Sequence, residues 1–524
     1  MMMRRLTAFF VVALLAAFAR PAAAATFRWA HDSDIASLDP YARNETLQLS
    51  LLGNVYEPLI RRGRGLQLEP ALATAWRQVA PLVWRFALRP GVKFQDGTPF
   101  SAADVVFSYQ RAIGAGSKIA LALAAVGDVR TVDAQTVDIV TTMPDPTLPE
   151  EIVRWDIMSA AWCRAHAAEQ VATADSYADD HADGTGPFSV ESRVPGEQTV
   201  LVANPNWWGK STGNVDRGVF RPIADSGARL AALTAGAVDM IASVPPDDLG
   251  ALARTQGVRI VHTASTRTIV LGFRHSRFVK GHGGPPRPNP FTDRRVRTAF
   301  AQAIDENAIV ATVMRGLATP AGLIVGPGVR GFDPALNQRP EYDPANARRL
   351  LAAAGYPAGF ALIMDCPNDR YINDAAICVA VAADLAKIGV RVTLLAQPRG
   401  RYFTKLLDPG RGADFYLMGW RPANDDTLDA LTNLAATRSD RLHTGAFNVG
   451  GYSNPALDAL IARARRESLG KARAALLRAA LAIVKDDVVY IPLHQPDVVW
   501  AVRDNVEAVP RGDGSFALSD VRVK

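Results

Sequence analysis

Residues 343–394 read DPANARRLLAAAGYPAGFALIMDCPNDRYINDAAICVAVAADLAKIGVRVTL, and this stretch indicates the fold most directly. Asp343-Pro344 supplies a helix N-cap followed by a proline, which is favoured in the first helical turn. Residues 345–354 are strongly helix-forming, and Gly355 stands where a left-handed residue commonly ends a helix. Residues 360–364 then form an apolar run, which predicts a strand directly after the helix.

The same helix–strand unit recurs further along this stretch. Apolar residues at helical spacing are Ile377, Val381, Leu385 and Ile388. Gly389 ends that helix, and residues 390–394 alternate as a strand. Helix–strand units in succession predict a mostly parallel sheet covered by helices, so the fold class is α/β. A further amphipathic helix is expected over residues 294–315, after an N-cap at Asp293.

Residues 84–140 show a different pattern of predicted elements. Short strand candidates lie at residues 84–88 and 92–94, and a second pair lies at residues 129–132 and 136–140. Ser101 followed by Asp104 predicts a capping box at a helix start. This region therefore indicates an α+β unit built on hairpins.

The size and composition of the chain bound its class. The chain has 524 residues, of which 48% are hydrophobic and 21% charged. This balance indicates a globular protein and argues against intrinsic disorder. Single cores stop growing beyond about 300 residues, so we expect at least two lobes.

Residues 1–25 have the three-part layout of a secretory signal peptide. Arg4 and Arg5 open it, an apolar run follows over residues 6–18, and residues 22–25 are alanines. The run is shorter than the roughly 20 residues that span a membrane. No cysteine follows for lipid attachment, so we expect an exported protein that is not a lipoprotein.

The charge balance gives no case for nucleic-acid binding. The formal net charge is +6, and loss of the three arginines in residues 1–25 leaves +3. Charges of both signs are interspersed, without a basic patch or stripe. Beyond residue 25 no apolar run is long enough for a transmembrane helix.

The cysteines suggest one bridge. Cys366 and Cys378 have 11 residues between them, and an oxidising compartment permits a disulfide. The chain-entropy model gives such a loop a contribution of roughly 3 kcal/mol. Cys163 is then expected to be a buried free thiol.

Motifs for catalysis or cofactors are weak. Residues 326–331 match the G-x-G-x-x-G spacing, but Pro327 interrupts it and no helix is predicted after it. No nucleophile elbow or zinc-binding helix motif occurs, and the eight histidines are scattered. We therefore expect binding rather than catalysis, with no cofactor and no metal.

Many short motifs carry a resemblance to a known family. In chain order they are Ser37–Pro40, Asn54–Glu57, Glu69–Ala73, Phe86–Pro99, Ala103–Ser108, Gly184–Phe188, Asn204–Gly209, Leu233–Asp239, Arg295–Asp305, Tyr342–Pro344, Gly451–Pro455 and Ile491–His494. Together they resemble the family-5 extracellular solute-binding proteins, the dipeptide-, oligopeptide- and nickel-binding receptors of ATP-binding-cassette importers. Most of these motifs are expected to encode packing rather than ligand contact.

The resemblance implies a periplasmic-binding-protein-like fold with two lobes, a hinge and an inserted subdomain. Residues 1–25 would be the signal peptide, and residues 57–182 the inserted subdomain. Lobe I would comprise residues 26–56, 183–272 and 496–524. Lobe II would comprise residues 273–495.

The resemblance also implies a ligand site between the lobes. Matching family positions predict ligand contacts from Asn44, Glu45, Arg370, Tyr371, Arg399, Trp420, Asn424 and Asp425. Dipeptide receptors carry an aspartate three residues after the pocket tryptophan, where it pairs with the ligand's ammonium, and this chain has Ala423 there. Asp425 or Asp426 could replace it from a shifted loop. Arg370 and Arg399 could offer forked donors to a ligand carboxylate.

These expectations amount to a periplasmic receptor that captures a peptide or a related zwitterionic or anionic solute. It would act as a monomer and deliver its ligand to an inner-membrane permease. Two alternatives stay open. One is a receptor for nickel or a metallophore, using His443 or His494 with acids such as Asp425, and the other is a secreted hydrolase.

Overall fold

The computed structural model describes residues 25–171, 175–242, 244–279, 287–408 and 413–524. The predicted signal peptide lies outside these residues, except for Ala25, which begins strand β1 (Ala25–His31). In the described part of the chain no helix is both long and apolar enough to cross a membrane.

A twelve-stranded sheet runs through the whole molecule. Its main path is β18 (Arg391–Gln397), β17 (Ala361–Pro367), β19 (Phe415–Trp420), β13 (Thr268–Phe273), β20 (Tyr490–Arg503), β11 (Met240–Ile241), β1, β10 (Val215–Pro222), β9 (Gln198–Ala203) and β8 (Phe188–Val194). Strands β12 (Val258–Ala264) and β16 (Ala318–Pro320) pair with β20 off this path. The α/β class predicted from the sequence is confirmed.

The direction of the strands corrects one expectation. β17 is parallel to both β18 and β19, as the helix–strand units predicted. β13, however, is antiparallel to β19 and β20, and β20 is also antiparallel to β11 and β12. The sheet is therefore mixed, because strands from distant parts of the chain join it and their direction leaves no local signal.

The helices beside β17 follow the capping residues that the sequence shows. α10 (Pro344–Ala353) begins after Asp343, whose side chain accepts a hydrogen bond from the Asn346 amide. α11 (Asp374–Ala386) lies between β17 and β18. The helix expected over residues 294–315 is two helices, α8 (Arg294–Ala303) and α9 (Glu306–Thr312), because Ile304 is extended and Asp305 caps α9.

The hairpin region forms a separate antiparallel sheet of four strands. Its order is β4 (Ala73–Ala80), β5 (Val83–Leu88), β7 (Thr136–Thr141) and β6 (Val126–Asp133), with α2 (Ala102–Ile113) beside it. Ser101 and Asp104 form the predicted capping box of α2. The prediction of a strand at residues 92–94 is wrong. Only an isolated bridge between Lys93 and Pro99 forms there, because the turn between them leaves too few residues to pair as strands.

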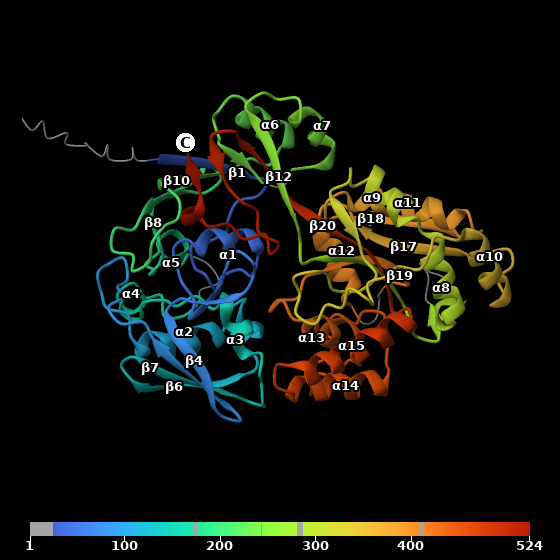
Figure 1. The fold of residues 1–524 in the computed structure, drawn as a ribbon, viewed down its shortest axis with the longest axis horizontal. Coiled ribbons are helices and arrows are strands. Elements are labelled where there is room, and N and C mark those ends of the chain that lie inside the picture. The colour runs from blue at the N-terminus through green and yellow to red at the C-terminus, as the bar shows by residue number, and fades with distance from the viewer. Residues whose placement is uncertain (1–24, 172–174, 243, 280–286, 409–412) are drawn as a thin grey trace, which may run out of the picture.

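Four hydrophobic cores divide the molecule into two lobes. The buried residues of two cores lie within residues 27–252 and 499–521, and those of the other two lie within residues 269–493. The four-stranded sheet shares its core with the first lobe. Figure 1 shows α1 (Thr46–Leu52), α2 and β8 on one side, α8 and β17 on the other, and β20 running between them.

The chain crosses between the lobes at two adjacent places. β20 contributes Ile491 and Leu493 to a core of the second lobe and Val499 and Ala501 to a core of the first. The segment from β12 to β13 makes the other crossing and pairs with β20 on both sides. These paired crossings have the geometry of a hinge.

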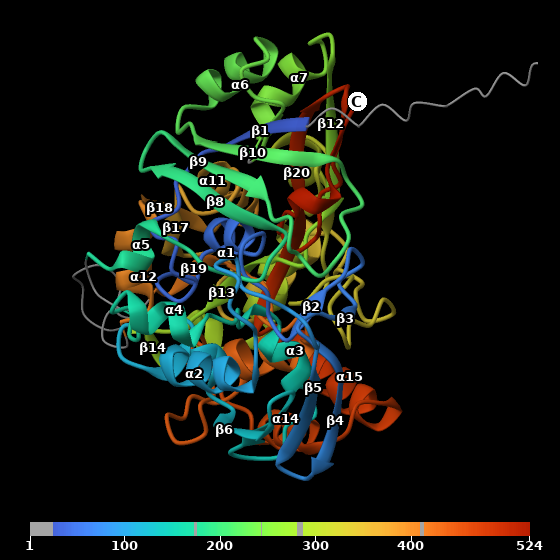
Figure 2. The ribbon, with the colours of Figure 1, turned by 90° about the vertical axis from the view of Figure 1, so that its left-hand side faces the viewer.

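The remaining elements complete the two lobes. The first lobe has helices α6 (Ser226–Thr234) and α7 (Leu249–Leu252) at the opposite end from the four-stranded sheet (Figure 2). It also holds β2 (Ile60–Arg62), β3 (Leu68–Pro70), α3 (Leu148–Glu151) and the 3₁₀ turn η2 (Ile152–Arg154). The second lobe adds α12 (Arg399–Leu406), α13 (Thr427–Ala430), α14 (Pro455–Arg466) and α15 (Lys471–Asp486).

Two family motifs of the first lobe have structural roles. A side chain at Gly184 would clash with the carbonyl of Val55, so only glycine allows this close approach. Trp207 and Trp208 are half-buried rather than fully buried, and their indole nitrogens donate to Glu57 at 3.2 and 2.8 Å.

Candidate functional site

The carboxyl ends of three neighbouring parallel strands carry four of the predicted site residues. β17 ends at Pro367, opposite Gln397 at the end of β18, and β19 lies on the other side of β17. Arg370 and Tyr371 follow β17, Arg399 follows β18, and Trp420 ends β19. Ligand sites in α/β proteins tend to lie at such an edge.

The loop that carries Arg370 and Tyr371 is held by hydrogen bonds to Asp374 and Gly419. The backbone amides of both residues donate to Asp374 Oδ2 at 3.0 Å, and Tyr371 Oη donates to the carbonyl of Gly419 at 3.3 Å. A side chain at Gly419 would meet the Tyr371 ring at 2.7 Å, so glycine allows the ring to lie against β19. The loop after β17 and the end of β19 are therefore in direct contact.

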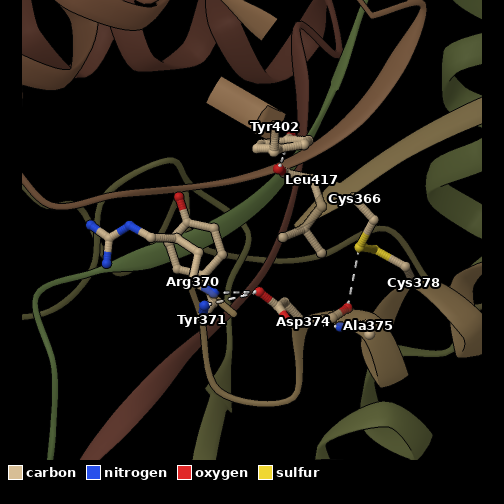
Figure 3. Close-up of a disulfide and its surroundings, with 8 residues drawn as sticks. All are labelled: Cys366, Arg370, Tyr371, Asp374, Ala375, Cys378, Tyr402 and Leu417. Carbon is tan, nitrogen blue, oxygen red and sulfur yellow. Dashed lines mark hydrogen bonds between the residues drawn. A yellow bond between two sulfur atoms is a disulfide. The ribbon is translucent and has the colours of Figure 1, made fainter. Parts of the chain in front are cut away.

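A disulfide closes the base of this loop. The structure joins Cys366, in β17, to Cys378, in α11, and both residues are buried. Figure 3 shows Arg370 and Tyr371 on the far side of the loop, pointing away from the two sulfurs. Cys163 is free and buried, as expected.

Trp420 is held from the side of α13. Its indole Nε1 donates to Asp429 Oδ1 at 2.9 Å, and its ring centroid lies 4.9 Å from that of Phe447. Burial raises the pKa of Asp429 to about 7, against the indole hydrogen bond, which lowers it. This carboxyl also accepts from Asn433 Nδ2 at 3.2 Å.

The two acids that could have replaced the family's ammonium partner both have other partners. Asp426 is fully buried, accepts two hydrogen bonds from Arg473 at 2.8 and 3.0 Å, and caps α13. Asp425 Oδ2 lies 3.2 Å from Arg62 Nε, and the neighbouring Asn424 carbonyl accepts from Arg62 Nη2 at 2.5 Å. Asn424 and Asp425 therefore contact the first lobe directly.

Asn44 and Glu45 stand apart from the other candidates. Both are exposed at the start of α1, and among the described residues no hydrogen bond or ion pair of theirs reaches the second lobe. An indirect link to the second lobe runs through the neighbouring loop. Gly514 of that loop lies beside Thr46, and the carbonyl of Asp513 accepts a hydrogen bond from Arg421 Nη1 at 3.0 Å. The structure thus brings together the second-lobe candidates but leaves these two at the edge.

Three arginines at the junction of the lobes are absent from the set predicted by sequence. Arg154 ends the turn η2, Arg267 lies between β12 and β13, and Arg421 follows Trp420. All three are half-buried, and burial lowers the pKa of each, that of Arg154 to about 9. Adjacency to Trp420 could have pointed to Arg421, whereas nothing local in the sequence marks the other two.

These arginines are close enough to affect one another. The positive charge of Arg421 lowers the pKa of Arg154, and the charge of Arg267 lowers the pKa of Arg421. Arg267 and Arg370 both lie against the Tyr371 ring, at 5.8 and 5.3 Å from its centroid. Arginines from both lobes therefore lie near one another at the junction, together with the carboxylates of Asp425 and Asp513.

A cavity of about 480 Å³ lies in the first lobe beside this junction. Its walls include α1, β2, η2 and the loop from Arg511 to Asp520. Arg62, Arg154 and Asp513 belong both to these walls and to the contacts described above. The cavity is large enough for a small organic solute, and all of its lining residues belong to the first lobe.

The metal alternative receives no support from the side chains. His494 is fully buried, and its Nδ1 lies 2.6 Å from Glu306 Oε1. His443 is exposed, and Asp425 is paired with Arg62. Among the residues that the structure describes, no three His, Cys, Asp or Glu side chains are grouped to hold a metal ion.

Comparison with known proteins places this geometry in a family. Two lobes and paired crossings between them define the class of two-lobed binding proteins. The model of Bacterial extracellular solute-binding proteins, family 5 Middle, matches residues 67–440. The chain belongs to this family, as the sequence motifs indicated.

Relatives cover nearly the whole chain. Glutathione-binding protein GsiB of Salmonella typhimurium is 26% identical over 501 residues, which cover 94% of this chain and 93% of GsiB. HbpA2 from Haemophilus parasuis is 25% identical with a TM-score of 0.81, over 95% of this chain and all of its own. The periplasmic binding protein DppA from Helicobacter pylori, solved with the peptide STSA, has 23% identity and a TM-score of 0.73, over 95% and 98% of the two chains. The family and these relatives are binding proteins rather than enzymes.

Proposed function

We propose that the protein captures a peptide or a related small zwitterionic or anionic solute between its lobes and delivers it to an ATP-binding-cassette permease in the inner membrane. The observation that carries this proposal is the convergence of Arg370, Tyr371 and Trp420 at the strand ends, directly beside the crossings between the lobes. The names of the relatives support it, because GsiB is a glutathione-binding protein and DppA was solved with a peptide.

We propose the domain bounds that the family resemblance implies. Residues 26–56, 183–272 and 496–524 form lobe I, residues 57–182 the inserted subdomain, and residues 273–495 lobe II. Arg62 and Arg421 each contact the opposite lobe in this structure, and opening about the paired crossings would break these contacts. The ligand contacts proposed are Asn44, Glu45, Arg370, Tyr371, Arg399, Trp420, Asn424 and Asp425.

Location and assembly are part of the same proposal. Residues 1–25 act as a cleaved signal peptide, and the mature monomer works in the periplasm without binding nucleic acid. The N-terminal sequence of the secreted protein tests the cleavage, and cell fractionation tests the periplasmic location. Light scattering of the purified protein tests the monomeric state.

Titration calorimetry against peptides, glutathione and small organic acids tests binding. We expect at least one solute to bind with 1:1 stoichiometry. A folded preparation that binds none of them, and that carries no bound molecule when examined by mass spectrometry, would overturn the proposal.

A further inference from the structure

Four arginines at the junction lack a carboxylate partner. Among the described residues, none of Arg154, Arg267, Arg370 and Arg421 makes an ion pair with an Asp or Glu side chain. Arg421 donates to a backbone carbonyl, and Arg267 and Arg370 lie on the Tyr371 ring. Arg154 makes no side-chain hydrogen bond or ion pair within the described part of the chain.

The acids nearby are already committed. Asp425 pairs with Arg62. Asp513 lies 3.3 Å from Arg511 Nη2 and accepts two hydrogen bonds from Ser515, at 2.9 and 2.7 Å. Asp429 accepts from Trp420 and Asn433. Asp425 and Asp513 also act electrostatically on Arg154 and Arg421, but each of these acids makes its ion pair with another arginine.

A partly buried charge without a counterion lowers the stability of the protein, because it has lost water contacts that no partner replaces. A guanidinium also cannot escape the cost by losing its proton, since it stays charged at neutral pH. Unpaired arginines that converge from η2, from the crossing segment and from the end of β19 therefore indicate a missing anion. Their forked N–H groups suit carboxylate oxygens.

We propose that Arg154, Arg267 and Arg421 form an oxyanion subsite where the lobes meet, and that the solute is an acidic molecule with at least two carboxylates. This inference rests on the proposed function and sharpens it. One carboxylate occupies the subsite, and a second lies near Arg370 beside Tyr371. Two anionic groups are proposed because Arg370 stands in the loop after β17, on a different element from the three arginines of the subsite.

Dipeptides of equal length and different charge test the inference on the mature full-length protein. Calorimetry compares Glu-Glu, Gln-Gln and Lys-Lys, with glutathione and inorganic phosphate as further probes. We expect Glu-Glu to bind at least tenfold more tightly than Gln-Gln, and Lys-Lys more weakly still. Binding of phosphate alone at the affinity of Glu-Glu would replace the carboxylate ligand with a phosphate one and overturn this assignment.

Two variants examine the subsite itself. Arg154→Gln and Arg267→Gln should each weaken Glu-Glu binding at least tenfold and change Gln-Gln binding less than threefold. Arg217→Gln is the matched control, because Arg217 lies on β10 and pairs with the exposed Glu191. It removes the same charge from a surface site and should leave all affinities unchanged.

Thermal unfolding separates a binding role from a structural one. Without ligand, Arg154→Gln and Arg267→Gln should unfold at the wild-type temperature or above it, because each removes an unpaired positive charge. Arg473→Gln breaks a buried pair with Asp426 and should unfold at a clearly lower temperature. Unfolding of the first two variants at a lowered temperature would show that these arginines serve the fold.

The outcomes distinguish the inference from the function on which it rests. Tight binding of a neutral or cationic solute, without any acidic one, overturns the subsite and leaves the solute receptor in place. The subsite is likewise overturned if both arginine variants bind Glu-Glu like the wild type. Failure of solutes of every charge to bind overturns the proposed function and the subsite together.

Discussion

Arg62 Nε lies 3.2 Å from Asp425 Oδ2, so a side chain of β2 in the first lobe is paired with the loop after β19 in the second. Arg330 makes a second such contact, with its Nη2 2.5 Å from Glu150 Oε1. The Arg62 and Asp425 side chains are only 10% and 3% exposed, which makes their pair more than a surface contact. These pairs hold the lobes together in the present conformation.

Asp425→Asn should shift the protein toward a more open form. It leaves the buried Arg62 without its charge partner, and breaking such a pair costs about 3 kcal/mol. Small-angle scattering without ligand should give a larger radius of gyration than for the wild type. The double variant Arg62→Gln/Asp425→Asn should recover part of the lost stability, and two strictly additive single effects would show that the pair carries no coupling.

Trp420→Ala should weaken solute binding about tenfold or more, because a large aromatic surface at the strand ends is lost. The protein should remain folded, as circular dichroism can show. Trp420→Phe keeps an aromatic ring but loses the hydrogen bond to Asp429, so an intermediate affinity is expected. Wild-type affinity in the alanine variant would remove Trp420 from the site.

The disulfide should stabilise the loop that carries Arg370 and Tyr371. Replacing both Cys366 and Cys378 with alanine should lower the unfolding free energy by about 3 kcal/mol, since a short closed loop is released in the unfolded chain. Hydrogen exchange over residues 368–373 should become faster. Cys163→Ala is the control and should leave that exchange unchanged, whereas equal exchange in all three proteins would refute the role of the bridge.

Asp429 should make stability depend on pH. Its pKa in the folded protein is raised to about 7, whereas in the unfolded chain it titrates near its ordinary value. The stabilising effect of its proton is therefore present below about pH 4 and is lost as the pH rises toward 7, by at most about 4 kcal/mol. Asp429→Asn cannot ionise, so it should gain stability relative to the wild type over this range. Unfolding curves of the two proteins that run parallel from pH 4 to pH 8 would rule out the raised pKa.

Local signals explain how much of this architecture could be predicted. Asp343, Gly355 and the Ser101–Asp104 pair fix helix ends through contacts within a few residues, and the structure confirms them. The order and direction of the strands depend on pairings over hundreds of residues, as between β1 and β10. No local pattern encodes such a pairing, and so the mixed character of the sheet could not be predicted.

The candidate site also combines residues that sequence motifs mark with contacts between residues distant in sequence. The positions of Arg370, Tyr371 and Trp420 at strand ends agree with the motif positions that the family resemblance gave, and their ligand contacts stay a prediction. The partners of Asp425 and Asp426 could not be predicted, because Arg62 and Arg473 are distant in sequence from their acids. Arg154 and Arg267 owe their importance to the meeting of the lobes, which only the folded chain reveals.

The central claim is that both lobes contact one solute, and hydrogen exchange tests it most directly. The mature protein would be compared with and without the tightest-binding member of the solute panel. We predict simultaneous protection of residues 368–371 and 419–426 in the second lobe and of residues 44–46 and 511–516 in the first. Protection confined to one lobe, or absent from all four segments, would contradict the claim.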